Sequence, residues 1–208
     1  MQELYELRKL INCVQDSYDE ITEQWEKIGK RMANLKKTLI SDMDSDSQIY
    51  LCILEYIRLL NDQVPEITEK FMQICDNEVM VRVKAQNSIE YKIQNYKTAK
   101  HEFGKVPINK CINDLFGVRF ILRDSLDYKS INTFVTEKYQ EKYKCIDSTK
   151  GDYKAVHIYF RRNNYSFPWE LQIWNECDKK ANFLSHKTYK QEYTLWEKES
   201  RKGGISRD

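Results

Sequence analysis

The apolar residues of this chain change their spacing near Val79, and that change restricts the fold more than any other feature of the sequence. Before this point they recur three and four positions apart, the spacing along one face of an α-helix. From Val79 onward they alternate with polar residues, as in a β-strand with one buried face. The pattern predicts an α+β protein in which a helical N-terminal region, residues 1–76, precedes a sheet.

The helical region begins with an apolar stripe that runs from Leu4 to Leu39 over five heptads. This spacing predicts one helix over residues 1–40, and the capping residues of 41–47 interrupt it. Second and third helices are expected within 47–76, the third starting at Pro65. We favour an antiparallel helical hairpin packed on the rest of the protein, because the second helix follows a short loop. A coiled-coil arm that forms a homo-oligomer is the alternative.

The second part of the chain, residues 77–198, contains four segments with the alternation of strands: 79–84, 116–122, 153–160 and 169–174. Helical patterns lie between them, from about residue 87 and over 127–141, and a charged helix is expected over 176–198. This order predicts a mixed sheet of four to five strands flanked by helices. We expect residues 199–208 to form a flexible tail.

The composition indicates a folded protein that stays in the compartment where it is made. Although 41% of the 208 residues are hydrophobic, no apolar run reaches the roughly 18 residues of a membrane span. The N-terminus lacks the apolar stretch of a signal peptide, so we expect a cytoplasmic protein with no membrane partner. The six cysteines show no C-x-x-C spacing, which argues against a zinc site or a redox motif.

The charge is distributed unevenly along the chain. Residues 1–75 carry 9 Lys/Arg and 14 Asp/Glu, a balance of −5, whereas the remaining residues have a balance of +7. A basic second half suggests a polyanionic ligand, such as nucleotide phosphates or RNA.

The alternation of the strands places polar residues on one face of the expected sheet. A single strand with such a face would simply be exposed to solvent. Here all four strands contribute basic, acidic or aromatic groups, so we interpret this face as a functional site. Its members are Arg82, Lys84, Arg119, Tyr153, His157, Glu170 and Gln172.

Five sequence blocks that contain these residues resemble a known family. The segment RVKAQNSIEYK (82–92) is similar to the R-x-K-x-x-x-S-x-x-x-K signature of RelA/SpoT synthetase domains, and INDLFGVRF (112–120) resembles their Asp-x-x-Gly-x-Arg strand. GDYKAVH (151–157), ELQIW (170–174) and SHKTYK (185–190) resemble their Gly-Tyr-x-x-x-His, Glu-x-Gln-Ile-Arg and His-x-x-x-Tyr-Lys blocks. The blocks occur in family order, and the resemblance implies a nucleotidyltransferase-like mixed sheet.

The resemblance implies a GTP pyrophosphokinase, also called GTP diphosphokinase. Such an enzyme transfers pyrophosphate from ATP to the 3′-hydroxyl of GDP or GTP and makes (p)ppGpp, the alarmone of the stringent response. The ATP phosphates need cations to neutralise their charge. The family pattern assigns the ATP site to Arg82, Lys84, Ser88, Lys92 and Arg119, with the Arg119 guanidinium stacked on adenine.

Two carboxylates, Asp114 and Glu170, match the residues that hold Mg²⁺ in the family. Mg²⁺ prefers one or two protein carboxylates together with water and phosphate oxygens. The resemblance therefore makes Asp114 and Glu170 the catalytic pair and Mg²⁺ the cofactor. Glu170 is also expected to help deprotonate the attacking hydroxyl.

The acceptor side is assigned by the same resemblance. Tyr153 would stack on the guanine, His157 would contact the phosphates or the ribose, and Gln172 would orient the acceptor. Lys150 or Lys154 would offset the charge of Asp152, which stands where the family usually has glycine. His186 and Lys190 would lie at the rim.

The chain also departs from the family. Trp174 stands in the position of the usual arginine, and Ser185 precedes the block's histidine. The segment KCIDSTKGDY (144–153) lacks the Lys-Asp-Tyr-Ile-like stretch that many synthetases have before the Gly-Tyr loop. None of the three histidines is followed by aspartate, so the alarmone hydrolase of longer members is not expected.

These departures keep two alternatives open. The first is a toxin-like enzyme, with an antitoxin partner, that pyrophosphorylates the 3′ end of tRNA. It needs a wide basic surface, for which the candidates are Lys142, Lys144, Lys150, Lys154, Arg161, Arg162, Lys179, Lys180 and Lys187. The second is a non-catalytic helical oligomerisation scaffold, which the presence of both Asp114 and Glu170 disfavours.

Overall fold

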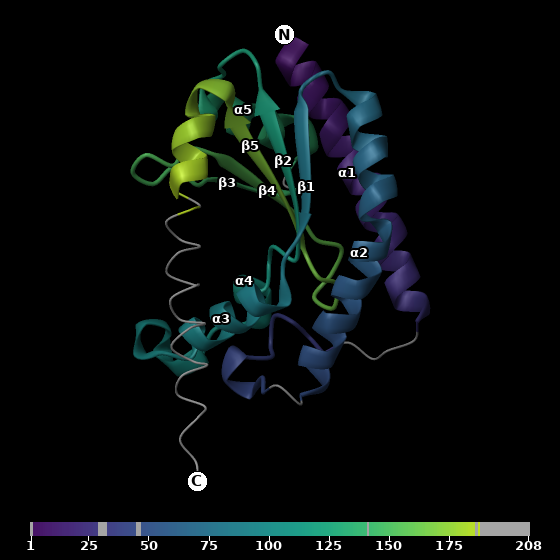
Figure 1. Ribbon diagram of the computed structural model, residues 1–208, viewed down its shortest axis with the longest axis vertical. Helices are drawn as coiled ribbons and strands as arrows, with labels where there is room; N and C mark the ends of the chain where they lie inside the picture. Colours follow the sequence, from purple (N-terminus) through teal and green to yellow (C-terminus); the bar gives the residue numbers. More distant parts are fainter. Residues whose placement is uncertain (1, 29–32, 45–46, 141, 186, 188–208) are drawn as a thin grey trace.

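The computed structural model describes residues 2–28, 33–44, 47–140, 142–185 and 187, and it is built around one mixed five-stranded sheet (Figure 1). The strands are β1 (Glu78–Val83), β2 (Phe116–Leu122), β3 (Lys144–Asp147), β4 (Val156–Phe160) and β5 (Trp169–Asn175). Their order is β1-β2-β5-β4-β3, and β2 and β5 are parallel while every other pair is antiparallel. The predicted fold class is confirmed.

The two longest helices, α1 (Gln2–Lys27) and α2 (Gln48–Ile74), run antiparallel along one side of the sheet (Figure 1). The predicted helical hairpin is therefore present. The apolar stripe of α1 is buried in the same core as the sheet, so it does not offer a free coiled-coil seam. No helix within the described residues combines the length and the apolarity needed to cross a bilayer.

The predicted length of the first helix was wrong, because α1 ends at Lys27 rather than at residue 40. Leu35 and Ile40 continue the apolar stripe in sequence but are buried by an irregular segment. Their backbone N–H groups donate to distant carbonyls, Leu35 to Asn164 and Ile40 to Val106. Hydrophobic spacing reports burial, and it cannot distinguish a helix from a loop held in this way. Residues 29–32 lie outside the described part of the chain.

The predicted break at Pro65 was also wrong, because α2 continues through it to Ile74. Proline removes one helical hydrogen bond and leaves the carbonyl four residues earlier without its partner. Here Pro65 and Asn61 both lie on the exposed side of α2, where water can hydrate that carbonyl. The apolar side, with Ile67 and Phe71, remains buried and holds the helix together.

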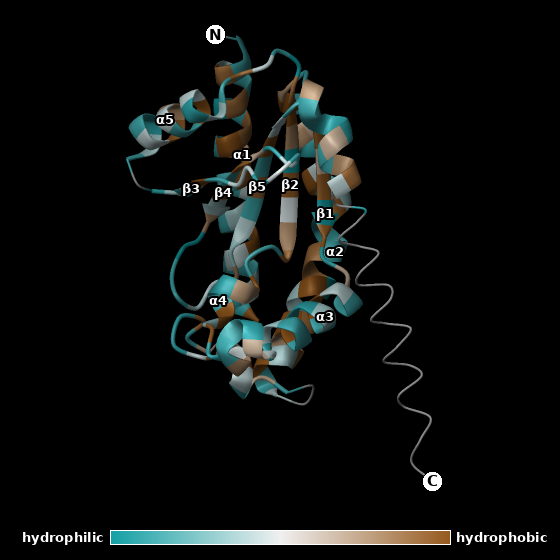
Figure 2. Ribbon diagram, turned by 90° about the vertical axis from the view of Figure 1, so that its left-hand side faces the viewer, coloured by the Kyte–Doolittle hydropathy of each residue, from teal (hydrophilic) through white to brown (hydrophobic). Residues whose placement is uncertain are grey.

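The shorter helices surround the remaining parts of the sheet. They are α3 (Gln86–Tyr96), α4 (Ile108–Cys111) and α5 (Tyr128–Tyr139), with 3-10 turns at Ile40–Asp42, Ala99–Gly104 and Glu176–Asp178. Residues 179–185 are helical, as predicted, whereas the expected tail 199–208 lies outside the described residues. Figure 2 shows the strands side by side, with α3 and α4 together beyond one end of the sheet.

One face of the sheet is apolar and packs against the long helices. Trp169 of β5 is fully buried there, between Phe116 of β2 at 3.9 Å and Tyr18 of α1 at 5.5 Å between ring centroids. The Trp169 indole Nε1–H donates to the buried hydroxyl of Tyr56 on α2 at 2.8 Å. This face thus joins both helices to the centre of the sheet through aromatic packing and one buried hydrogen bond.

The other face carries the polar residues, as the alternation predicted. Strand pairing aligns them in two rows across the sheet. The first row is Arg82, Gly117, Glu170 and Tyr159, and the second is Met80, Arg119, Gln172 and His157. Because paired residues of neighbouring strands point to the same face, each row brings its side chains together.

Tyr153 departs from its predicted position on a strand, because β4 starts at Val156. It closes a tight turn instead: the N–H of Lys150 donates to the carbonyl of Tyr153 at 2.8 Å, and the reverse bond is 3.2 Å long. Gly151 occupies the turn with a φ of +59°, a conformation that favours glycine.

Replacing Tyr56 with phenylalanine tests the link between α2 and the sheet. The variant leaves the buried indole N–H of Trp169 without its acceptor, so we expect the free energy of unfolding to fall by about 1–3 kcal/mol. Urea denaturation followed by tryptophan fluorescence would measure it. Tyr165→Phe is the control, because Tyr165 is exposed and its loss should cost less than about 0.5 kcal/mol. Equal effects of the two substitutions would contradict this account.

Candidate active site

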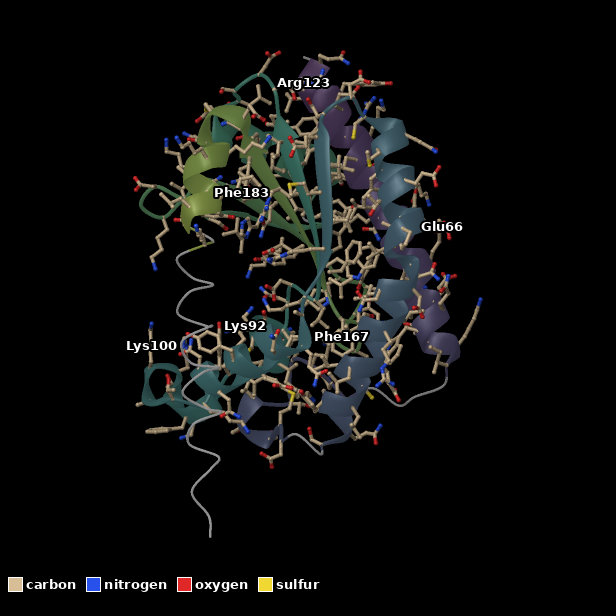
Figure 3. The ribbon with its side chains drawn as sticks, in the orientation of Figure 1. Glu66, Lys92, Lys100, Arg123, Phe167 and Phe183 are labelled. Carbon is tan, nitrogen blue, oxygen red and sulfur yellow. The ribbon has the colours of Figure 1, made fainter. Side chains whose placement is uncertain are left out.

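A cavity of about 1000 Å³ opens on the polar face of the sheet, between β1, α3, the 148–153 turn and the ends of β4 and β5. It collects ten of the eleven predicted site residues from segments that are far apart in sequence. They are Arg82, Lys84, Ser88, Lys92, Asp114, Lys150, Tyr153, His157, Glu170 and Gln172. The structure brings these residues together, while their individual roles remain predictions. Figure 3 shows Lys92 between α3 and the sheet.

Asp114 lies at the centre of a cluster of cations. Its Oδ2 is 2.6 Å from Lys84 Nζ and 3.8 Å from Arg82 Nη2, and its Oδ1 is 3.0 Å from Lys92 Nζ. Lys84 follows β1, Lys92 comes from α3 and Asp114 precedes β2, so the carboxylate joins three elements. The side chains of both lysines and of Asp114 are largely buried.

The cluster sets the protonation of its members. Burial alone would raise the pKa of the Asp114 carboxyl, but the charges of Lys92 and Lys84 hold it well below its usual range. Burial also lowers the pKa of the Lys84 ammonium, although Asp114 opposes this shift. For Lys92 the attraction of Asp114 outweighs burial, and its pKa is raised. The three groups form a compact charged site with more positive than negative charge, which suits phosphate oxygens.

Glu170 is held by three side chains, two from the neighbouring strand β4 and one from its own strand β5. The Tyr159 hydroxyl donates to Oε1 at 2.9 Å, His157 Nδ1 lies 3.0 Å from the same oxygen, and the Gln172 amide donates to Oε2 at 2.7 Å. Burial would raise the pKa of Glu170, but these partners, His157 above all, hold it below its usual range. The carboxylate is therefore ionised and fixed in orientation near neutral pH.

Tyr159 was not among the predicted site residues. It lies two positions after His157 on β4, and alternation places both on the polar face, so the sequence contained the signal. Burial and the neighbouring Glu170 raise the pKa of its phenol well above the usual range. Tyr159 therefore stays protonated and acts as a hydrogen-bond donor to Glu170.

Tyr153 reaches the site from its turn. Its hydroxyl lies 2.9 Å from His157 Nε2, so His157 connects Tyr153 to Glu170 through its two ring nitrogens. Mainly because of burial, the pKa of Tyr153 is raised to about 12. The ring also packs edge-on against Trp174, with centroids 6.0 Å apart.

Arg119 is the one predicted residue that does not line the large cavity. It lines a second cavity of about 380 Å³ next to it, together with Arg82, Gln172 and Phe183. Its guanidinium carbon lies 3.7 Å above the ring of Trp174 and 5.2 Å from that of Phe183. Neither aromatic residue was predicted to belong to the site, although Trp174 lies two positions after Gln172 on β5. Figure 3 shows Phe183 on the helical segment 179–185, beside the sheet.

Gly117 of β2 lines the second cavity and faces the Arg82 side chain. A Cβ at this position would lie 3.2 Å from Nε and 3.4 Å from Cγ of Arg82, its cross-strand neighbour. The absence of a side chain lets Arg82 lie flat across β2 and reach both cavities.

The carboxylates of the cavity fit a shared magnesium site rather than a closed protein cage. Within the described residues, no group of three or more His, Cys, Asp or Glu side chains is arranged to hold a metal ion. Asp114 and Glu170 supply two hard oxygen donors to the same cavity. Mg²⁺ is commonly bound by one or two carboxylates, with substrate phosphates and water completing its shell.

Comparison with known proteins identifies the family to which these residues belong. The family described as "Region found in RelA / SpoT proteins" matches residues 81–194. The chain belongs to the RelA/SpoT family. This match confirms the resemblance predicted from the five sequence blocks. None of the curated proteins compared with the chain matches it.

Solved structures similar to this RelA/SpoT protein include two small alarmone synthetases from Bacillus subtilis. Synthetase 1 is 16% identical with a TM-score of 0.40, and the match covers 72% of this chain and 82% of that one. Synthetase 2 is 18% identical with a TM-score of 0.38, covering 71% and 82%. Synthetase 1 bound to its product pppGpp is 15% identical with a TM-score of 0.38, covering 67% and 78%.

The departures from the RelA/SpoT pattern lie around the same cavities. Asp152 and Lys150 both line the mouth of the large cavity, where Gly151 turns the chain between them. Ser185 also lines this cavity, and the Trp174 ring lies against the guanidinium of Arg119. His186 and Lys190, predicted for the rim, lie outside the described residues.

Replacing Asp114 with asparagine tests the ion cluster in the metal-free protein. It leaves two buried lysines uncompensated, so the free energy of unfolding should fall by about 3–5 kcal/mol at pH 7. Because the folded-state pKa is lowered, the stabilisation by Asp114 is complete above its ordinary pKa of about 4 and is lost as the pH falls below it. The difference from the unsubstituted protein should shrink from pH 5 to pH 3 in urea titrations with EDTA. Asp62→Asn, at an exposed position of α2, is the control and should change little. A loss independent of pH would contradict the assignment.

Proposed function

We propose that this protein transfers pyrophosphate from ATP to the 3′-hydroxyl of GDP or GTP and produces (p)ppGpp. The observation that carries the proposal is that Asp114 and Glu170 meet three cations, those of Arg82, Lys84 and Lys92, in one cavity. All five belong to the blocks that define the resemblance to RelA/SpoT synthetases. A non-catalytic scaffold would not require these groups to meet in a cavity of about 1000 Å³.

The donor nucleotide is proposed to bind where the two cavities meet. Arg82 lines both of them, so it can contact the phosphates on one side and the adenine on the other. Lys84 and Lys92 would exchange part of their contact with Asp114 for contacts with phosphate oxygens, since phosphates offer stronger negative charge. Ser88 lies on the same side of α3 as Lys92 and adds a hydroxyl donor.

The reaction forms one P–O bond and breaks another. The acceptor 3′-oxygen forms a bond to the β-phosphorus of ATP, the bond from that phosphorus to the α,β-bridging oxygen breaks, and AMP leaves. Arg82, Lys84 and Lys92 neutralise the charge on the transferred group. Glu170, ionised and fixed by its partners, accepts the proton of the attacking hydroxyl.

Magnesium is part of the proposal because the donor set fits it. Asp114 and Glu170 would hold the ion together with the nucleotide phosphates. When bound, Mg²⁺ would withdraw charge from the phosphate oxygens and lower the barrier to attack. In the absence of nucleotide, the oxygens of Asp114 are engaged by lysines, so we expect metal and nucleotide to bind together.

The acceptor is proposed to lie between the 148–153 turn and Glu170. Tyr153 offers an aromatic side chain for guanine, and its bond to His157 holds the phenol in place. Lys150 and Asp152 stand together at the mouth, where the lysine offsets repulsion between the aspartate and the acceptor phosphates.

A free nucleotide is favoured over tRNA as the acceptor because part of the expected basic surface is already neutralised. Lys154 lies 3.3 Å from Asp178, Lys179 lies 2.6 Å from Glu78, and Arg162 lies 3.6 Å from both Glu23 and Glu26. These three of the nine candidate residues are engaged by carboxylates within the chain. Transfer to the 3′ end of tRNA remains the outcome that would replace the proposal.

The acceptor experiment tests the proposed function directly. Purified protein is incubated with Mg²⁺ and γ-labelled ATP, and separately with GDP, GTP or deacylated tRNA, and the labelled products are separated. We expect label on GDP or GTP and none with Asp114→Ala, which loses a proposed metal ligand. Label on tRNA alone would make the enzyme a tRNA pyrophosphokinase, and no transfer to any acceptor would overturn the proposal.

Gly117→Ala tests whether Arg82 must lie flat across β2 to bind the donor. The added methyl should displace the Arg82 side chain, which is half-exposed and can move. We expect the KM for ATP to rise about 5-fold to 20-fold, equivalent to roughly 1–2 kcal/mol of lost binding, while thermal stability changes little. The control is Gly151→Ala, since a Cβ there meets no atom within 4 Å although the positive φ costs some stability. An unchanged KM for ATP in Gly117→Ala would contradict the role given to Arg82.

A further inference from the structure

Arg119 is held by two different kinds of contact on the polar face. Its Nε and Nη2 donate to Gln172 Oε1 at 3.3 and 3.1 Å, and Gln172 is its partner in the pairing of β2 with β5. The guanidinium carbon also lies over the Trp174 ring, 3.7 Å from the ring centroid. The stacking sets the plane of the guanidinium, and the forked hydrogen bond sets its rotation within that plane. Arg119 is thus fixed before any nucleotide binds.

This arrangement determines which way the Gln172 amide points. A glutamine amide presents an acceptor at one end and a donor at the other. Because Oε1 accepts from Arg119, Nε2 must face the opposite side, where it donates to Glu170 Oε2 at 2.7 Å. A reversed amide would place an NH₂ group against the guanidinium and an oxygen against the carboxylate, and both contacts would be repulsive.

Gln172 in turn controls one oxygen of the catalytic carboxylate. Tyr159 and His157 engage Glu170 Oε1, whereas Gln172 donates to Oε2. Gln172 and Glu170 are both buried, at 5% and 4% exposure, so water competes weakly for these bonds. The orientation of Glu170 therefore depends on Gln172 on one side and on β4 on the other.

We propose that Arg119 is a positioning residue for Glu170, acting through the Gln172 amide, in addition to its expected stacking on the donor base. The inference rests on the proposed function, which makes Glu170 a catalytic group. It assigns to Gln172 a structural link between the two cavities rather than only a contact to the acceptor. It also gives a role to Trp174, whose ring keeps the Arg119 guanidinium in the orientation in which it can donate to Gln172.

The proposal predicts a loss of turnover that ATP cannot restore. If Arg119 only stacked on adenine, its removal would raise the KM for ATP and leave kcat unchanged at saturation. If it also orients Gln172, its removal frees the amide to rotate and loosens Glu170. Loss of partners that orient a metal-binding group commonly lowers activity or metal affinity about 10–100-fold.

The test is a double-mutant cycle of Arg119→Met and Gln172→Met, with kcat and the KM for ATP measured using GDP as the acceptor. We expect each single variant to lower kcat about 10–100-fold. The kcat of the double variant should be no more than about twofold below that of the less active single variant, because both substitutions break the same link. Arg119→Lys keeps one donor for Oε1 and should recover part of kcat, which also guards against a general loss of folding in Arg119→Met.

Arg82→Met provides the matched control. It removes a cation from the other wall of the second cavity, and the Arg82 partner that the structure shows is Asp114 rather than Gln172. The fold-loss of kcat when Arg82→Met and Gln172→Met are combined should therefore equal the product of the two separate losses. The proposal would be overturned if Arg119→Met left kcat unchanged at saturating ATP. It would also be overturned if the kcat losses of Arg119→Met and Gln172→Met multiplied in the double variant.

A second readout separates failure of this proposal from failure of the proposed function. The affinity for Mn²⁺, used as a spectroscopic substitute for Mg²⁺, is measured by electron paramagnetic resonance with a non-hydrolysable ATP analogue. Arg119→Met should weaken Mn²⁺ binding about 10-fold, as Gln172→Met does, with no further loss in the double variant. Unsubstituted protein that transfers to no acceptor would overturn the function, while unchanged Mn²⁺ affinity in Arg119→Met would overturn the positioning role.

Discussion

The carboxylate of Asp114, buried among Lys84, Lys92 and Arg82, is the interaction on which the site depends. A buried carboxylate is costly unless cations compensate it, and buried cations are equally costly without an anion. The cluster satisfies both requirements while drawing together the end of β1, the helix α3 and the approach to β2. In the proposed function, the same balance would prepare the site for a nucleotide, because phosphate oxygens would take over the lysines and release Asp114 for a metal ion.

A second network on the sheet complements the first. Glu170 is fixed by donors from β4 and β5, and Arg119 of β2 completes the chain of contacts through Gln172. The first cluster is flexible in its partners, since lysine side chains can move between a carboxylate and a phosphate. The second is rigid, since aromatic stacking and in-plane hydrogen bonds fix each member. In the proposed function, the first network would bind charge and the second would orient the reacting groups, on different parts of one sheet face.

The apolar face makes this polar face possible. Trp169 and its aromatic neighbours bury one side of the central strands against α1 and α2, so the opposite side can carry buried charge without loss of the fold. The N-terminal helices therefore support the site from behind, at the rows that contain Gly117 and Glu170. The long helix α2 also reaches the site through α3, because the Tyr50 hydroxyl donates to Glu90 at 2.6 Å.

The fold class, the polar face and the family could all be predicted from the amino-acid sequence. Alternation along a strand has a period of two, so the side of each residue follows from its position, and Arg82, Arg119 and Glu170 could be placed on one face from their spacing alone. The extent of the helices could not be predicted, because Leu35 and Ile40 show the spacing of a helix but are buried by a loop bound to distant carbonyls. Nor could the sequence place Tyr153 in a turn or Phe183 beside Arg119. The side chains that meet across β2, β4 and β5 could be identified only in the folded protein, since strand order and pairing register depend on contacts between residues that are far apart in the chain.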